Sequence, residues 1–163
     1  MNKDVCCPEF NPAPWDEKEL TLKDELFIKD RVTCLFHIPL NFGSKMVKNV
    51  TAMEACGAMP PENEFIVLSG KDTMWGMDLY LKALKDVPGV QMTTISGTFM
   101  TKVFEGPYSN TSKWIKGMNG FVNSRGKEII ELLTFYTTCP KCAKKYGRNY
   151  VVLFARIKFR LRT

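Results

Sequence analysis

The sequence predicts an α+β protein in which a strand–helix–strand–strand unit occurs twice. Three observations lead to this fold class. Of the 163 residues, 45% are apolar and 25% are charged, which is the composition of a globular protein with a sizeable core. Apolar residues alternate in some segments, as in strands, and recur every three or four residues in others, as in helices. Shifting Pro39 onto Pro107 also places the elements of the first half on those of the second.

The first copy covers about residues 31–84. Apolar and polar residues alternate over 31–38, which predicts a strand that the following proline ends. A helix is predicted next, and Gly57 supplies the residue that ends it. The apolar face of this helix comprises Phe42, Met46, Val50 and Met53. Residues 65–68 and 74–84 then predict two further strands.

The second copy covers about residues 92–159 and has the same element order. A strand is predicted over 92–104, with Gly97 as a candidate bulge. The helix that follows has an apolar face of Trp114, Met118, Phe121 and Val122. Two more strands are predicted over 132–137 and 150–159. Between these two strands the copy carries a short insertion, CPKCAKKYGRN, which we expect to be a loop that carries function.

Residues 1–30 are predicted to form an extended, proline-dotted leader that packs on the domain formed by residues 31–163. Phe10 and Trp15 are its expected anchors. The first ten residues show no apolar segment typical of a signal peptide, and six cysteines without one indicate a reducing compartment, so we expect a cytoplasmic protein. The longest unbroken apolar stretch, 151–155, is far shorter than the roughly 20 residues of a membrane span, so no membrane is an expected partner.

The net charge of +6 comes largely from basic residues near the C-terminus. Such a patch fits nucleic acid, but a solvated surface with a basic C-terminal tail is the preferred interpretation. The sequence has no basic helix, helix-turn-helix or Arg/Gly-rich segment, so nucleic acid is not an expected partner. It also has no GxSxG, Walker-type or GxGxxG motif, which leaves serine-hydrolase and nucleotide-binding classes without support. The oligomeric state is not predicted.

About residues 92–158 resemble the second half of gyrase-inhibitor-like (GyrI-like) small-molecule-binding domains, in which a strand is followed by Gly-Pro-Tyr, here Gly106-Pro107-Tyr108. The first copy extends the match back to about residue 31. With CCP near the start and CPKC before the last strand, the chain is similar to a bacterial branch described as hydrolases. The resemblance implies an antiparallel sheet with two helices on one face and a central ligand groove. It also implies either effector binding or hydrolysis of small reactive molecules. The last strand lacks the acid that many effector-binding members use for cationic ligands.

Glu105 is the candidate catalytic residue, because it immediately precedes the Gly-Pro-Tyr turn. We expect aromatic rings to bury it in part, and desolvation would then raise its pKa. These rings belong to Tyr108, Trp114, Trp75 and Tyr136. A carboxylate of raised pKa suits a general base that activates water, while the Tyr136 hydroxyl polarises the substrate. In the alternative interpretation Glu105 caps the turn and faces solvent.

His37, the only histidine, matches Glu105 when the two copies are aligned, so the two residues occupy equivalent positions. It is therefore a candidate ligand-binding residue, together with Trp75, Tyr108 and Trp114. Aromatic walls suit a small apolar or aromatic ligand. In the alternative interpretation His37 is a hydrogen-bonded structural residue. A single histidine excludes a catalytic zinc site rich in histidine.

The strand over 74–84 leaves one question open. Alternation places Asp78 and Tyr80 on one face and Met77 and Leu79 on the other. The pattern alone does not decide which set packs on the helices, and therefore whether Asp78 is a buried acid.

Four of the six cysteines lie in polar, turn-like surroundings and form a candidate structural zinc site: Cys6, Cys7, Cys139 and Cys142. The Cys-x-x-Cys spacing of the second pair brings two thiolates within reach of one tetrahedral Zn²⁺, and the N-terminal pair is the source of the other two ligands. Nearby lysines would lower the thiol pKa. Two alternatives stay open, a redox dithiol and thiols without metal, one of them a nucleophile. Cys34 and Cys56 are expected in the core.

Taken together, the sequence predicts a small-molecule-binding protein with an aromatic central groove. In one interpretation it hydrolyses a small reactive compound with Glu105 as the base. In the other it is a non-catalytic module that senses or sequesters its ligand. A third interpretation, an interaction protein, would use the basic tail and the cysteine loop.

Overall fold

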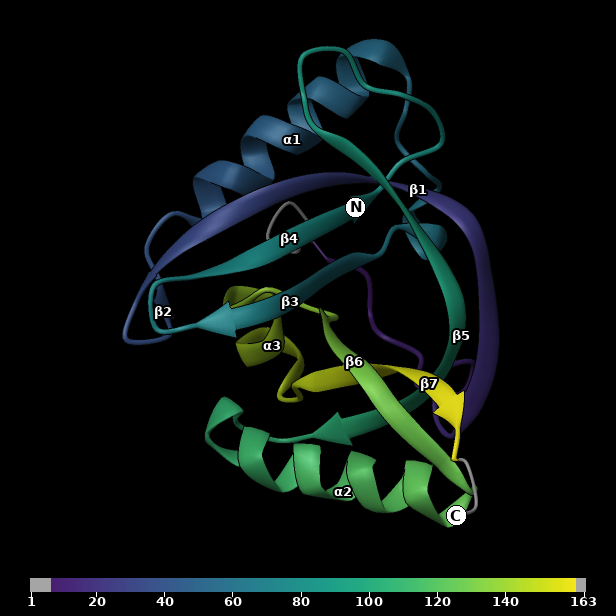
Figure 1. The fold of residues 1–163 in the computed structure, drawn as a ribbon. Helices are drawn as coiled ribbons and strands as arrows, with labels where there is room; N and C mark the ends of the chain where they lie inside the picture. The colour runs from purple at the N-terminus through teal and green to yellow at the C-terminus, as the bar shows by residue number, and fades with distance from the viewer. Residues whose placement is uncertain (1–6, 161–163) are drawn as a thin grey trace. The chain divides into compact units, whose positions relative to one another are not determined.

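A computed structural model describes residues 7–160 of the chain (Figure 1). It divides into two compact units. One comprises Lys23–Ser96, and the other combines the residues up to Leu22 with those from Gly97 onward. The prediction of a mixed α+β fold with antiparallel strands is confirmed in both units.

The unit of residues 23–96 contains most of β1 (Lys18–Leu35), β2 (Ile38–Pro39), α1 (Phe42–Cys56), β3 (Val67–Thr73) and β4 (Gly76–Lys82). Its strands lie in the order β2-β1-β4-β3, and each neighbouring pair is antiparallel. Helix α1 ends as predicted, because Gly57 adopts the left-handed conformation with φ 69°.

One face of these strands packs on α1. The buried side chains on this face include Ile28, Val32, Leu79 and Leu81, and they contact Met53 of the helix. This packing answers the question about β4: its odd-numbered residues face α1, so Asp78 and Tyr80 point to the opposite face of the strands.

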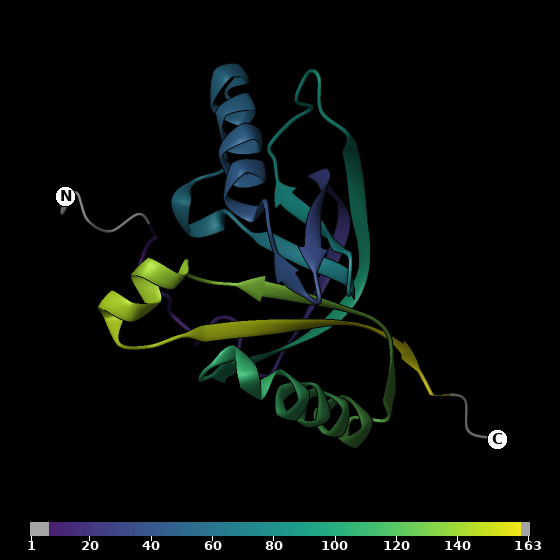
Figure 2. The same ribbon diagram turned by 90° about the vertical axis from the view of Figure 1, so that its left-hand side faces the viewer.

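The second unit contains most of β5 (Met92–Glu105), together with α2 (Thr111–Ser124), β6 (Lys127–Tyr136) and β7 (Tyr150–Phe159). Its strands lie in the order β6-β7-β5 and are antiparallel. Figure 2 shows α2 lying along these strands. The contact is apolar and comprises Trp114, Met118 and Val122 of the helix with Met100, Val151, Leu153 and Ala155 of the strands.

Apart from the two-residue strand β2 and the helix α3, the two units have the same element order and the same pairing. In one unit β1 and β3 both pair with β4, and in the other β5 and β6 both pair with β7. This agreement is what a duplicated β-α-β-β unit requires. That the copies arose by duplication, and that they enclose a shared groove, stay predictions.

Phe10 and Trp15 anchor the leader, as the sequence predicts. The ring of Phe10 contacts Tyr150 at 5.5 Å between centroids, and that of Trp15 contacts Phe154 at 5.6 Å. Thr101 donates a hydrogen bond to the Trp15 carbonyl at 2.6 Å, which fixes the backbone of the leader beside β5. Residues 7–16 therefore form part of the second unit.

Several predicted elements were wrong in extent or in type. Strand β1 begins at Lys18 rather than at Arg31, because its first residues are mostly exposed and their charged side chains can stay in solvent. Strand β6 likewise begins at Lys127. The insertion after β6 is not a loop but contains the helix α3 (Pro140–Tyr146), with proline in its first turn and a left-handed Gly147 at its end.

Candidate ligand pocket and cysteine cluster

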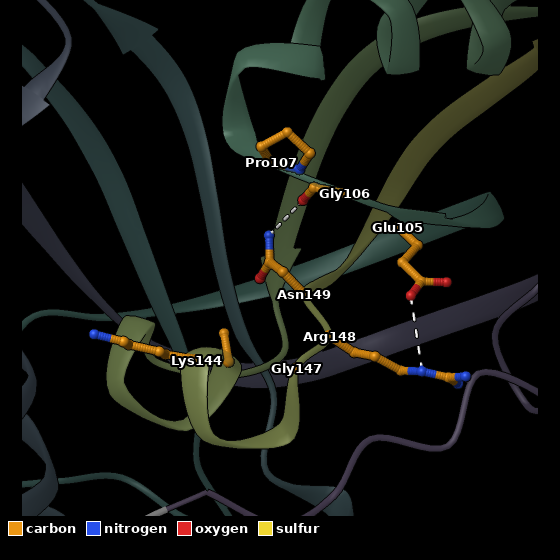
Figure 3. A pocket seen from close by; sticks show the side chains of 8 residues that line it. Glu105, Gly106, Pro107, Lys144, Gly147, Arg148 and Asn149 are labelled. Carbon is orange, nitrogen blue, oxygen red and sulfur yellow. Dashed lines mark hydrogen bonds and ion pairs between the residues drawn. The ribbon is translucent and has the colours of Figure 1, made fainter.

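A pocket of about 410 Å³ lies in the second unit, where β5 ends and β7 begins (Figure 3). One wall consists of residues 105–107 at the end of β5. The other consists of Ala143 and Lys144 of α3 and of residues 147–149 in the turn that follows. The pocket thus joins the Gly-Pro-Tyr turn to the insertion, the two features that distinguish the second copy.

Asn149 holds the two walls together. The side-chain amide of Asn149 donates to the backbone carbonyl oxygen of Gly106 at 2.9 Å. The backbone carbonyl oxygen of Asn149 accepts a hydrogen bond from the Gly106 N–H at 3.0 Å. Gly106 has φ 134°, and a Cβ atom there would lie 3.1 Å from the Asn110 side chain. Only glycine therefore suits this turn.

Glu105 lies at the rim of the pocket, and its side chain is 53% exposed. Its carboxylate is 3.9 Å from Nε of Arg148, which Figure 3 shows reaching toward it. The expectation that aromatic rings bury Glu105 was wrong. Successive residues of a strand point to opposite faces, so Phe104 packs against Trp114 while Glu105 points to solvent.

The predicted aromatic residues of this unit occupy two environments. Trp114 is only 6% exposed and belongs to the core under α2. Tyr108 and Tyr136 are 44% and 37% exposed and pack edge to face at 5.6 Å. The Tyr108 hydroxyl donates to the side-chain oxygen of Asn149 at 3.3 Å, next to the pocket. Partial burial raises the pKa of Tyr108, so its hydroxyl stays protonated at neutral pH.

His37 and Trp75 lie together in the first unit, at neighbouring turns. The His37 N–H donates to the carbonyl of Met74 at 3.3 Å, and its Nδ1 lies 3.3 Å from Asp72. Trp75 is 64% exposed and packs on Phe36. Neither His37 nor Trp75 is among the residues that line the pocket at the end of β5.

Sequence reasoning did not predict three polar residues of the pocket: Lys144, Arg148 and Asn149. The only signal was the position of the insertion, and its functional role stays a prediction. The sequence pattern also does not decide whether Asp78 is buried. This carboxylate is buried and accepts a hydrogen bond from Arg31 at 2.8 Å, with Lys29 and Lys71 at 3.8 and 4.0 Å.

The sulfur atoms of Cys7, Cys139 and Cys142 lie within 4.8 Å of one another. Cys142 is fully buried, and the backbone N–H of Cys139 lies 3.4 Å from the Cys7 sulfur. Burial raises the pKa of the Cys7 thiol well above its usual value. Three sulfur donors so close together form a candidate metal site, and thiolates are preferred ligands of zinc. The fourth predicted ligand, Cys6, lies outside the described residues.

This mixed α+β fold agrees with the architecture that the resemblance to GyrI-like domains implied. The chain belongs to the family described as bacterial hydrolase, whose model matches residues 1–157. No curated protein matches the chain in sequence at a significant level.

Two solved structures show the same fold. One is the C-terminal domain of EcmrR, with 8% identity and a TM-score of 0.66 over 90% of this chain and 99% of that chain. The other is a hydrolase from Listeria innocua, with 12% identity and a TM-score of 0.62 over 88% of this chain and 92% of that chain.

A third similar structure is EcmrR in a complex with DNA. The match covers 90% of this chain and 58% of that chain, with 12% identity and a TM-score of 0.63. The expectation that nucleic acid is not a partner is therefore unsupported. Within residues 7–160, no helix combines the length and apolar character that crossing a membrane requires.

Proposed function

We propose that this protein binds a small organic molecule in the pocket between β5 and α3 and hydrolyses it with Glu105 as general base. The observation that supports this proposal is the position of Glu105, whose carboxylate lies at the rim of the pocket and faces Arg148. Membership of a hydrolase family agrees with it. An apolar or aromatic ligand would also contact Tyr108 and Tyr136 outside the pocket wall, with the Tyr136 hydroxyl polarising the substrate.

The chemistry follows from the exposure of Glu105. In solvent a carboxylate is a weak base, but a ligand that covers the rim would exclude water from it. The carboxylate would then accept a proton from one retained water molecule, which attacks the substrate. Arg148 would hold the carboxylate in place and meet negative charge that develops on the substrate.

Glu105→Gln tests this function, because the amide keeps the size of the side chain but cannot accept the proton. We expect hydrolysis of p-nitrophenyl acetate, used as a probe ester, to fall at least about 100-fold. Binding of the dye anilinonaphthalene sulfonate should stay within about twofold. Glu128→Gln, which changes an exposed carboxylate paired with Lys158, is the matched control. Equal hydrolysis by the wild type and Glu105→Gln would remove Glu105 from the mechanism.

The second candidate function is a ligand-sensing or sequestering module without catalysis. The exposure of Glu105 favours it, because an enzyme commonly shields its base from solvent. In that case the wild type would bind the dye but show no hydrolysis above that of the Glu128→Gln and Glu105→Gln proteins.

The proposal includes a structural zinc ion held by Cys7, Cys139 and Cys142, with Cys6 as the fourth ligand, in a cytoplasmic protein. The support is the sulfur cluster, in which residues from both ends of the chain meet. Protein purified under reducing conditions should contain about one equivalent of zinc by atomic emission. Cys7→Ser should lose it, and Cys56→Ser, outside the cluster, should keep it. Comparing Cys6→Ser with Cys7→Ser tests the fourth ligand.

A further inference from the structure

We infer that metal binding at the cysteine cluster controls the ligand pocket, because the short helix α3 contributes to both. This inference rests on the proposed zinc site and assigns that site a role in ligand binding. The argument concerns only the second unit, in which all of the residues lie.

Helix α3 faces the cluster with one residue and the pocket with the next two. Cys142 is fully buried among the sulfur atoms, while Ala143 and Lys144 line the pocket. The helix has only seven residues, and the side chain of its N-cap residue, Cys139, makes no capping hydrogen bond. Because isolated helices of this length are unstable in water, contacts outside the helix must hold it.

The leader supplies such contacts at both ends of α3. At the start of the helix, the Cys139 N–H donates to the Cys7 sulfur at 3.4 Å. At its end, the Tyr146 hydroxyl donates to the Cys7 carbonyl at 2.7 Å. A zinc ion bound to the three sulfur atoms would turn this weak hydrogen-bonded contact into a cross-link. It would join segments that are 132 residues apart.

The position of α3 directly affects Arg148 and Asn149, because both residues lie in the turn that follows the helix. Gly147 ends the helix with φ 68°, and its N–H donates to the backbone carbonyl oxygen of Lys144. The turn then places Arg148 opposite Glu105 and clamps Asn149 to Gly106. If α3 loosens, Arg148 and one wall of the pocket lose their support, while β5 and Glu105 stay in place.

The binding step is balanced in protons. Binding of zinc by Cys7, Cys139 and Cys142 would release one proton from each thiol, and the three thiolates together with the ion would carry one net negative charge. Lys144 and Lys145 lie in the last turn of α3 and offset this charge. Zinc binding would therefore weaken as the pH falls, because protons compete with the metal for the sulfur atoms.

Hydrogen exchange on the reduced full-length protein tests this inference, with added ZnSO₄ or with a zinc chelator. We expect zinc to slow exchange at least about tenfold over residues 140–149. Exchange in α1, which lies in the other unit, should not change. Affinity for anilinonaphthalene sulfonate should change at least about threefold on chelation. Cys142→Ser should behave as chelated protein, and Cys56→Ser as wild type.

The outcomes separate the two proposals. If wild-type protein takes up no stoichiometric zinc, the zinc site is wrong and the inference fails with it. If zinc binds but exchange over 140–149 and dye affinity do not change, the site stands and its control of the pocket is refuted. Because chelation uses the wild-type chain, the test holds even if Cys142→Ser does not fold. Loss of esterase activity alone bears on neither.

Discussion

Gly106 shows how a single backbone position decides the shape of the pocket. Its φ of 134° and the 3.1 Å approach of Asn110 leave no room for a side chain. We expect Gly106→Ala to lower the free energy of unfolding by about 1–2 kcal/mol and to weaken dye binding. Gly120→Ala is the matched control, because Gly120 lies within α2 and a Cβ there would meet nothing within 4 Å.

The control should instead raise the free energy of unfolding by about 0.5–1 kcal/mol, as alanine favours a helix more than glycine does. Urea denaturation of both variants measures the difference. Similar effects of the two substitutions would show that the turn tolerates a side chain and that its geometry does not define the pocket.

Glu105 shows the limit of residue-level reasoning. The sequence places Glu105 directly before the turn, but whether its side chain is buried depends on which face of the strand packs on the core. Strand alternation puts its neighbour Phe104 on the core side, and the carboxylate therefore faces solvent. Its catalytic role stays a proposal that Glu105→Gln can test.

At the scale of elements, Asp30 links β1 to α1. Its carboxylate accepts hydrogen bonds from Lys45 at 2.8 Å and Asn49 at 2.9 Å. Burial by itself would raise the pKa of Asp30, but together these hydrogen bonds outweigh burial and hold the pKa below its usual value. The ionised form therefore stabilises the fold above roughly pH 4, and this contribution is lost as the pH falls through the folded-state pKa.

We expect Asp30→Asn to make the free energy of unfolding less dependent on pH below about pH 4. Lys45→Met should have the same effect by removing one of the donors that lower the pKa. Denaturation curves at several pH values measure this slope. An unchanged slope in both variants would contradict the linkage.

The leader is the second element whose contribution can be measured. The Trp15 ring packs on Phe135 and Phe154 at 5.9 and 5.6 Å. Trp15→Ala should lower the free energy of unfolding by about 2–3 kcal/mol, because it removes a large apolar contact. Trp75→Ala, at a 64% exposed tryptophan, should cost less than about 1 kcal/mol. Equal losses in urea denaturation would show that the leader contributes no more than a surface ring.

At the scale of the whole molecule, zinc should stabilise the folded chain if the three sulfur atoms bind it. A ligand at 100 times its Kd adds about 2.7 kcal/mol to the stability of the state that binds it. For a chain of this length that corresponds to a rise in Tm of roughly 5–10 °C. Differential scanning fluorimetry with zinc and with a chelator measures it. No shift in Tm would count against metal binding by the folded chain.

The sequence by itself determined the local structure. Gly57 ends α1, the alternation over 150–159 forms β7, and Phe10 and Trp15 anchor the leader. Even α3 had its signals in Pro140 and Gly147, although the short insertion was read as a loop. These features depend on side-chain periodicity and backbone conformation, which a few neighbouring residues set on their own.

Only the tertiary structure decided which distant residues meet. It brought Cys7 to Cys139 and Cys142, placed Asn149 against Gly106, and turned Asp78 away from α1. Such contacts depend on strand pairing and on the packing of whole faces, and no local pattern encodes either. The residue types of the proposed metal and ligand sites can therefore be read from the chain, whereas the arrangement that brings these residues together arises from packing.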